Sequence, residues 1–107
     1  MSWVKACRAD IAAGECKGVQ VNGVPLAIFN VEGELHATSN ICTHQHALLS
    51  DGYLEGDFIE CPLHQARFNV KTGASEGLPD APNLQVFALR IENGEVMVEI
   101  MDQAATT

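Results

Sequence analysis

Basic residues, long apolar runs and extended helical periodicity are all scarce in this sequence. Six lysines and arginines face fourteen aspartates and glutamates, so the formal net charge is −8. A negative charge of this size repels phosphate backbones, which argues against nucleic-acid binding and favours a partner with a basic surface. No segment approaches the ~20 apolar residues that a membrane-spanning helix requires. We therefore expect a soluble protein that binds neither nucleic acid nor a membrane.

The start of the chain lacks the features of a secretory leader. Strand-like residues at Trp3 and Val4 follow Met1 closely, without a basic start, an apolar stretch and a small-residue cleavage site. The four cysteines are too few for a disulfide-dense mini-scaffold. We expect a cytoplasmic protein in which Cys7 and Cys16 are ordinary buried or half-buried thiols.

The length of 107 residues is near the common size of one compact domain. We therefore predict a single domain over residues 1–107. Short runs of Val, Ile, Leu and Phe alternate with Gly, Asn and Asp, which predicts an all-β fold. Asn22-Gly23 and Asn93-Gly94 supply the positive φ angles of tight turns. The predicted hairpins pair 18–21 with 24–31 and 84–91 with 96–101.

Shorter signals complete the expected topology. Glu32-Gly33-Glu34 predicts a turn that folds 27–31 back onto 35–38, and residues 10–15 are expected to hold one helical turn. Residues 102–107 are expected to fray.

The middle of the chain, about residues 39–83, differs from the clean strands on either side. It contains many turn residues, and Pro79–Asn83 cannot extend a β-ladder and should form an irregular loop. We predict antiparallel sheets that form a base, with a loop-rich cap inserted over about 39–83.

The cap carries the residues with the clearest chemistry. Cys42 and His44 form a C-x-H box, and Cys61 and His64 form a C-x-x-H box after sixteen intervening residues. Each box offers one soft thiolate and one imidazole. Both boxes lie beside predicted turns, so two loops can hold one metal centre between them.

Three interpretations of the boxes compete. A single zinc ion accepts two cysteines and two histidines, but structural zinc sites commonly place like ligands in pairs. A two-iron cluster suits a mixed pair on each loop, because each loop reaches one iron with its cysteine and the other with its histidine. The third interpretation is chance.

The two boxes and their spacing resemble the Rieske family. From Trp3 to Ile100 the chain is similar to the ferredoxin components of bacterial aromatic-ring-hydroxylating dioxygenases, and the matching segments include Thr43, 51–56, 59–65 and 68–70. This resemblance implies the Rieske fold and one [2Fe-2S] cluster. The implied ligands for both cofactor and metal are Cys42, His44, Cys61 and His64.

The resemblance also implies the partners. A flavin-dependent, NADH-oxidising ferredoxin reductase would donate electrons, and a terminal oxygenase component would accept them. No nucleophile–base pair and no nucleotide-binding glycine loop is recognisable, so the chain is expected to be a non-catalytic relay. We expect a monomer, and its encounters with the two partners are expected to be small and short-lived.

Histidine ligation should make the cluster a ready electron acceptor. Two ferric ions, two sulfides and two thiolates sum to a neutral cluster, whereas four thiolates would make it dianionic. High-potential Rieske proteins add a disulfide between the loops at positions that here are Ala47 and Leu63, and hydroxyls where this chain has Ala66 and Phe68. We therefore predict a potential toward the low end of the ~−150 to +300 mV Rieske range.

Two further histidines lie outside the boxes. Gln45 and His46 replace the glycine and small residue usual in these ferredoxins, and His46 is interpreted as a surface residue at a loop tip rather than a fifth ligand or a proton relay. His36 is expected to face solvent from a strand.

Three other functions stay open from the sequence. Within the family, the chain could be the fixed small subunit of an assimilatory nitrite reductase. Outside it, the boxes could hold zinc in a colourless binding module. An iron–sulfur sensor is a third candidate, although no regulatory domain is recognisable.

Overall fold

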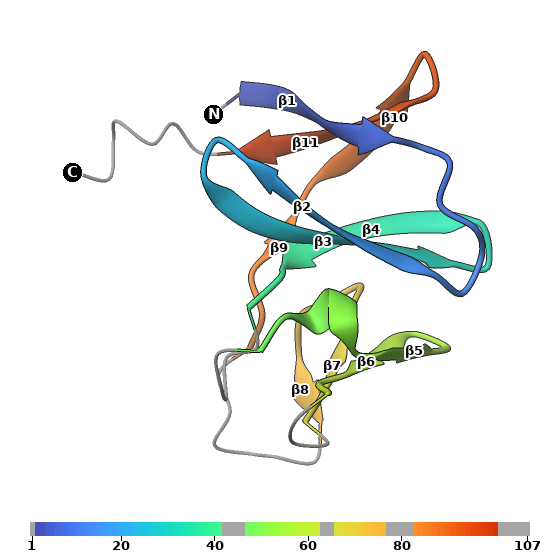
Figure 1. Cartoon of the computed structure of the whole chain (residues 1–107), viewed down its shortest axis with the longest axis vertical. Helices are drawn as coiled ribbons and strands as arrows, with labels where there is room; N and C mark the ends of the chain where they lie inside the picture. Colours follow the sequence, from blue (N-terminus) through green and yellow to red (C-terminus); the bar gives the residue numbers. More distant parts are fainter. Residues whose placement is uncertain (1, 42–46, 63–65, 77–82, 101–107) are drawn as a thin grey trace.

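The computed structural model describes residues 2–41, 47–62, 66–76 and 83–100. Their strands form three antiparallel sheets, in the orders β1-β11-β10, β2-β3-β4-β9 and β5-β6-β7-β8. The first two sheets make the base, and the third makes the cap below it (Figure 1). The elements are β1 Ser2–Arg8, β2 Cys16–Val21, β3 Val24–Val31, β4 Glu34–Ser39, η1 Leu49–Asp51, β5 Tyr53–Glu55, β6 Phe58–Glu60, β7 Arg67–Asn69, β8 Ser75–Glu76, β9 Val86–Phe87, β10 Leu89–Glu92 and β11 Glu95–Ile100.

The Asn-Gly hairpins form where the sequence predicts them. Asn22 and Gly23 join β2 to β3 with φ angles of 52° and 81°, and Asn93 and Gly94 join β10 to β11 with 53° and 75°. These paired positive φ angles are those of two-residue turns that match strand twist. The prediction of an all-β fold built from antiparallel sheets is confirmed.

The central strand β3 is buried on both faces, in keeping with the uninterrupted apolar residues at 24–29. Leu26 and Ile28 point into a core between the two base sheets, where they meet Val96 and Val98 of β11. The alternate residues, among them Phe29, point into a second core that the cap covers. The β1-β11-β10 sheet and the cap are therefore packed against opposite faces of β3.

The cap sheet is amphipathic across its short strands. Leu54, Ile59 and Phe68 face the core shared with β3, and Ile59 and Phe68 are fully buried. The intervening residues face outward, and Arg67 stacks 5.0 Å from the ring centre of Phe58 on that outer face. Hydrophobic burial on one face thus attaches the cap to the base.

Two local predictions need correction. Residues 10–15 form a turn, closed by the Glu15 N–H and the Ala12 carbonyl at 3.0 Å, rather than a helical turn, because Gly14 adopts a φ of 85°. The predicted strand over 84–91 is broken at Ala88, because β9 pairs with β4 whereas β10 pairs with β11. The chain changes sheets at that residue.

The other short predictions have mixed outcomes. The third turn is two residues long, Glu32 and Gly33, so Glu34 already pairs with Val31 as the first residue of β4. The short helix η1 is the only helical segment among the described residues, and the sequence signals did not predict it. No helix in the described ranges is long and apolar enough to cross a membrane. Residues 102–107 lie outside the described residues.

Both cysteines outside the boxes are shielded from solvent, as predicted. Cys7 is 8% exposed in the core between the base sheets, and Cys16 is half-buried at the start of β2. Burial raises the pKa of the Cys16 thiol, and the carboxylates of Asp51 and Glu15 raise it further. Both thiols therefore stay protonated, and unreactive, at neutral pH.

We predict slow alkylation of Cys16 with a displaced pH dependence. Because the folded state holds the thiol proton more tightly than the unfolded state, its labelling should begin at higher pH than that of the denatured chain. Iodoacetamide labelling followed by peptide mass spectrometry, with and without urea, measures both profiles. Equal labelling rates at neutral pH would contradict the prediction.

Candidate metal centre

Of the four predicted ligands, the structure describes only Cys61. Cys42 and His44 fall in 42–46, and His64 falls in 63–65, which lie outside the described residues. His46 lies outside them as well. The described residues nonetheless include the segments at which each loop begins and ends, which form the neck of each loop.

The first loop has a closed neck. Ile41 and Leu48 form an antiparallel bridge across it, so the chain on either side of 42–46 is paired. Behind the bridge, the Leu49 N–H donates to the Asn40 carbonyl over 2.8 Å. The loop is thereby held between the end of β4 and the short helix η1.

The second loop is closed in the same way. Cys61 follows β6, and its backbone N–H donates to the Ala66 carbonyl over 2.8 Å, just before β7 begins. Because β6 and β7 pair directly, Cys61 and Ala66 lie side by side at one end of this strand pair. Cys61 is therefore held by the cap sheet.

Gly52 brings the two necks together. It follows η1, and a Cβ atom built on it would collide with the backbone carbonyl oxygen of Glu60. Its φ of −89° is ordinary for any residue, so the requirement for glycine is one of space alone. The return of the first loop therefore lies directly against the residue that precedes Cys61.

The segment after 77–82 is attached to the same cap. The Leu84 N–H donates to the Gly73 carbonyl over 2.7 Å, and the Asn83 side chain accepts from the Ser75 N–H over 3.2 Å. Gly73 has a φ of 81°, and a Cβ there would collide with the Leu84 carbonyl oxygen. The predicted loop at Pro79–Asn83 lies mostly outside the described residues, but its far end is held against the cap sheet.

Cys61 lies in surroundings that suit a metal-bound thiolate. It is 1% exposed and belongs to the apolar cluster that includes Ala47, Ala66 and Phe68. A buried thiolate in such surroundings needs a cation to compensate its charge, and a metal centre supplies that compensation. The donor chemistry and the burial therefore fit a metal group at this position.

The same apolar cluster bears on two predictions about the residues around the metal centre. Ala66 and Phe68, 1% and 0% exposed, share the core with Cys61, so apolar side chains stand where high-potential relatives have hydroxyls. Ala47 is also in this core, and an alanine cannot form a disulfide. The surroundings of Cys61 are consistent with the expected low potential, which stays a prediction.

His36 departs from its prediction. Its side chain is only 19% exposed, and its Nε2 lies 2.7 Å from a carboxylate oxygen of Glu34. That nitrogen is buried and makes no hydrogen bond within the described residues. Its contact with the Glu34 carboxylate is that of an ion pair. The prediction that His36 faces solvent is wrong, because His36 sits opposite Phe29 on the sheet face that the cap covers.

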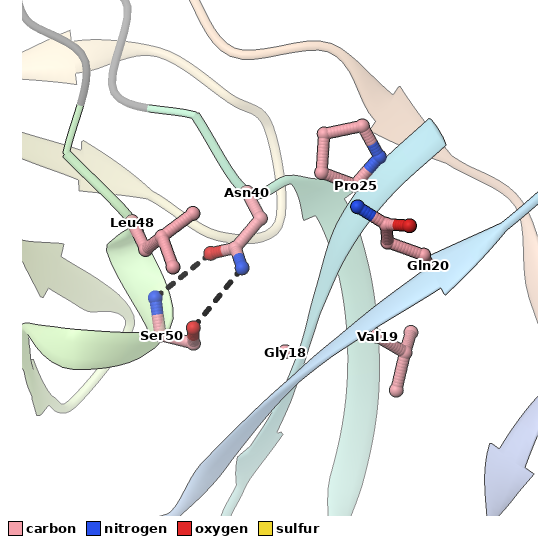
Figure 2. Close-up of a pocket in the computed structure, with 7 residues that line it drawn as sticks. All are labelled: Gly18, Val19, Gln20, Pro25, Asn40, Leu48 and Ser50. Atoms are coloured by element: carbon pink, nitrogen blue, oxygen red, sulfur yellow. Dashed lines mark hydrogen bonds between the residues drawn. The ribbon is translucent and has the colours of Figure 1, made fainter. Parts of the chain in front are cut away.

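Sequence patterns missed two residues that shape the necks. Asn40 is 4% exposed, and its side-chain amide bonds to Ser50 beside a surface pocket of about 310 Å³ (Figure 2). Gly52 lies in the segment 51–56 that resembles Rieske ferredoxins, but no role for it was predicted. The available signal for Asn40 was its position two residues before Cys42, just after the predicted strand over 35–38. The signal for Gly52 was a glycine between two cap elements.

The comparisons with known proteins agree with this architecture. Residues 2–88 match the family model described as Rieske [2Fe-2S] domain. The ferredoxin component of a naphthalene 1,2-dioxygenase system of Pseudomonas putida is 48% identical over 101 residues, covering 94% of this chain and 97% of that protein.

Solved structures give the same result. A Sphingomonas yanoikuyae B1 ferredoxin matches with a TM-score of 0.86 and 35% identity, over 92% of this chain and 99% of that one. A structure described as a complex of reduced oxygenase and oxidized ferredoxin in carbazole 1,9a-dioxygenase matches with a TM-score of 0.83 and 43% identity, over 90% and 91%. Since the family model matches residues 2–88 and these relatives cover 90 to 94% of the chain, this protein belongs to the Rieske [2Fe-2S] domain family.

Proposed function

We propose that this chain is a one-electron carrier that holds one Rieske [2Fe-2S] cluster on Cys42, His44, Cys61 and His64. It passes electrons from an NADH-dependent flavoprotein reductase to a terminal aromatic-ring-hydroxylating dioxygenase. The observation that carries the proposal is the match over 101 residues with a dioxygenase ferredoxin component, which covers 97% of that protein. The burial of Cys61 at a loop neck supports the ligand set.

The chemistry needed is simple, because a bound Rieske cluster takes up and releases one electron at a time. The residues of the chain shield and hold the ligands. Cys61 contributes its sulfur from within an apolar core, which excludes water from that side. Gly52 lets the two loop necks touch, so the ligands of both loops are held relative to one another.

The surface charge determines which partners can approach. Among the described cations, Lys5, Arg67, Lys71 and Arg90 each lie within 4 Å of a carboxylate. Since the remaining acids are in excess, the net charge of −8 steers the chain toward basic partner surfaces. Steering of this kind accelerates encounter without making the complex long-lived, as repeated exchange requires.

Further parts of the proposal concern the whole protein. The 107 residues act as one Rieske domain, in which about 39–83 form the cluster-binding cap. The carrier works as a cytoplasmic monomer that meets its reductase and its oxygenase in turn. Analytical ultracentrifugation of the loaded protein tests the monomer, and a stable oligomer would contradict it.

The ligand set is tested by substitution with matched controls. Cys61→Ala should abolish the visible absorbance of the purified protein, because a thiolate ligand is lost. Cys7→Ala removes another buried thiol, from the other core, and should keep the cluster. His44→Gln and His64→Gln should also lose it, whereas His36→Gln should retain it.

Spectra of the unmodified protein distinguish the proposal from its alternatives. After reduction with dithionite, low-temperature EPR should give an average g value clearly below that of all-thiolate clusters. A colourless, EPR-silent protein with stoichiometric zinc, produced with ample iron, would instead support a zinc-binding module.

Electron transfer itself is tested by reconstitution. The loaded chain should couple NADH oxidation by a flavoprotein ferredoxin reductase to substrate hydroxylation by a naphthalene-type terminal oxygenase, and Cys61→Ala should not. A chain that holds the cluster but supports no transfer with any such pair would contradict the partner assignment while leaving the cofactor intact.

A further inference from the structure

The chain leaves the base for the first metal-binding loop at Asn40, a polar residue that is almost wholly buried. Its backbone N–H donates to the Pro25 carbonyl at the start of β3 over 3.0 Å. Its carbonyl accepts from the Leu49 N–H of η1 over 2.8 Å. Asn40 is therefore the residue at which the base, the loop and η1 are connected.

The side chain of Asn40 holds the same junction with both of its polar atoms. Oδ1 accepts from the Ser50 N–H over 2.8 Å, and Nδ2 donates to Ser50 Oγ over 3.0 Å (Figure 2). An amide suits this position because it presents one acceptor and one donor side by side. A carboxylate would lack the donor and would bury a charge.

The base strand β2 lies against this pair of side chains at Gly18. A Cβ atom there would lie 2.6 Å from Ser50 Oγ and 2.8 Å from Asn40 Nδ2, so no larger residue fits without displacing the pair. Two residues earlier, Cys16 Sγ donates to the Ser50 carbonyl over 3.5 Å. Ser50 is thus held by Asn40 from one side and by β2 from the other.

We propose that Asn40, together with Ser50 and Gly18, is a positioning site for the first metal-binding loop. It holds the neck of 42–46 in one geometry, so that Cys42 and His44 present their ligand atoms together. This inference rests on the proposed function, since Cys42 and His44 are ligands only within it. Asn40 acts through the loop and touches no reacting atom.

The expected effect follows from local opening of the neck. A cluster held by two loops becomes accessible to water and chelators when one loop neck opens, without unfolding of the whole domain. One intramolecular hydrogen bond changes such an equilibrium by roughly twofold to tenfold. Loss of both side-chain bonds of Asn40 should therefore accelerate cluster loss by roughly fourfold to 100-fold.

Three substitutions disturb the site in different ways. Asn40→Leu removes both side-chain bonds at similar volume, Ser50→Ala removes the Oγ partner, and Gly18→Ala displaces the pair without deleting a polar atom. Gln20→Ala is the control, because Gln20 is exposed on the same strand and lines the same pocket. The measurements are the rate of absorbance loss under an iron chelator, the EPR spectrum and the reduction potential of the full chain.

We expect faster cluster loss and altered EPR and potential in all three variants, with Asn40→Leu most affected and Gln20→Ala unchanged. Variants with lower thermal stability but unaltered spectrum, potential and chelator resistance would overturn the inference, because the role would be merely structural. If Asn40→Leu does not fold, the same measurements on Ser50→Ala test the inference.

An unmodified protein without a Rieske spectrum would overturn the proposed function and this inference together. A normal spectrum with unaffected variants would overturn this inference alone.

Discussion

Gly52→Ala should unfold this protein at a much lower temperature and prevent stable cluster binding. The added Cβ would collide with the Glu60 carbonyl oxygen, a backbone atom fixed in β6 that cannot move aside alone. Overpacking against backbone should cost about 3 kcal/mol or more. In a domain of this size that corresponds to a fall of roughly 12 to 24 °C in Tm.

Gly56→Ala provides the matched control for this prediction. Gly56 lies at the turn between β5 and β6 with a φ of 59°, and a Cβ there meets nothing within 4 Å. Its replacement costs only backbone strain, about 1 kcal/mol. Thermal unfolding followed by circular dichroism, together with the absorbance of the cluster, compares the two variants. Similar Tm values for both would show that the cap can separate its loop necks at little cost.

Phe68→Ala should destabilise the cap from within its core. Phe68 is completely buried on β7 and belongs to the same apolar cluster as Cys61. Removal of a buried phenylalanine ring costs about 3 to 5 kcal/mol, including the cavity that remains. Because the cavity opens in the cluster that contains Cys61, water should enter and the cofactor should be lost faster than in the unmodified protein.

The neighbouring strand offers the control for this change. Phe58 on β6 is half-buried on the outer face of the cap sheet, where Arg67 stacks on it. Phe58→Ala should cost about 1 kcal/mol, since it opens no internal cavity. Urea unfolding of both variants and the half-life of cluster absorbance are the measurements. Equal losses of stability and of cluster half-life in the two variants would contradict the assignment of the apolar core to the inner face of the cap sheet.

Several elements were predictable because their causes are local. The Asn22-Gly23 and Asn93-Gly94 turns follow from the φ angles that those residues tolerate. The buried residues of β11 alternate with less buried ones, and its sequence predicts this because Val, Val and Ile occupy every second position. The Cys/His boxes were recognisable because ligand type and spacing lie within short segments, although the ligand set itself stays a prediction.

Other features depend on residues that are distant in the chain. The strand predicted over 84–91 breaks at Ala88 because its two halves pair with different sheets. His36 is shielded because its face of β4 lies beside Phe29 under the cap. No local pattern encodes which face a distant segment will cover.

The sequence by itself determined the hairpins, the continuous apolar strand that becomes β3, and the pattern of thiolate and imidazole residues in the cap. These depend on backbone preference, hydrophobicity and ligand chemistry, which each short segment carries with it. Only the tertiary structure decided that Asn40 connects the base to the first loop, and that the lack of a Cβ at Gly52 makes room for the Glu60 carbonyl oxygen. Such contacts arise when separate segments pack to interior density, so they are properties of the assembled fold rather than of any segment.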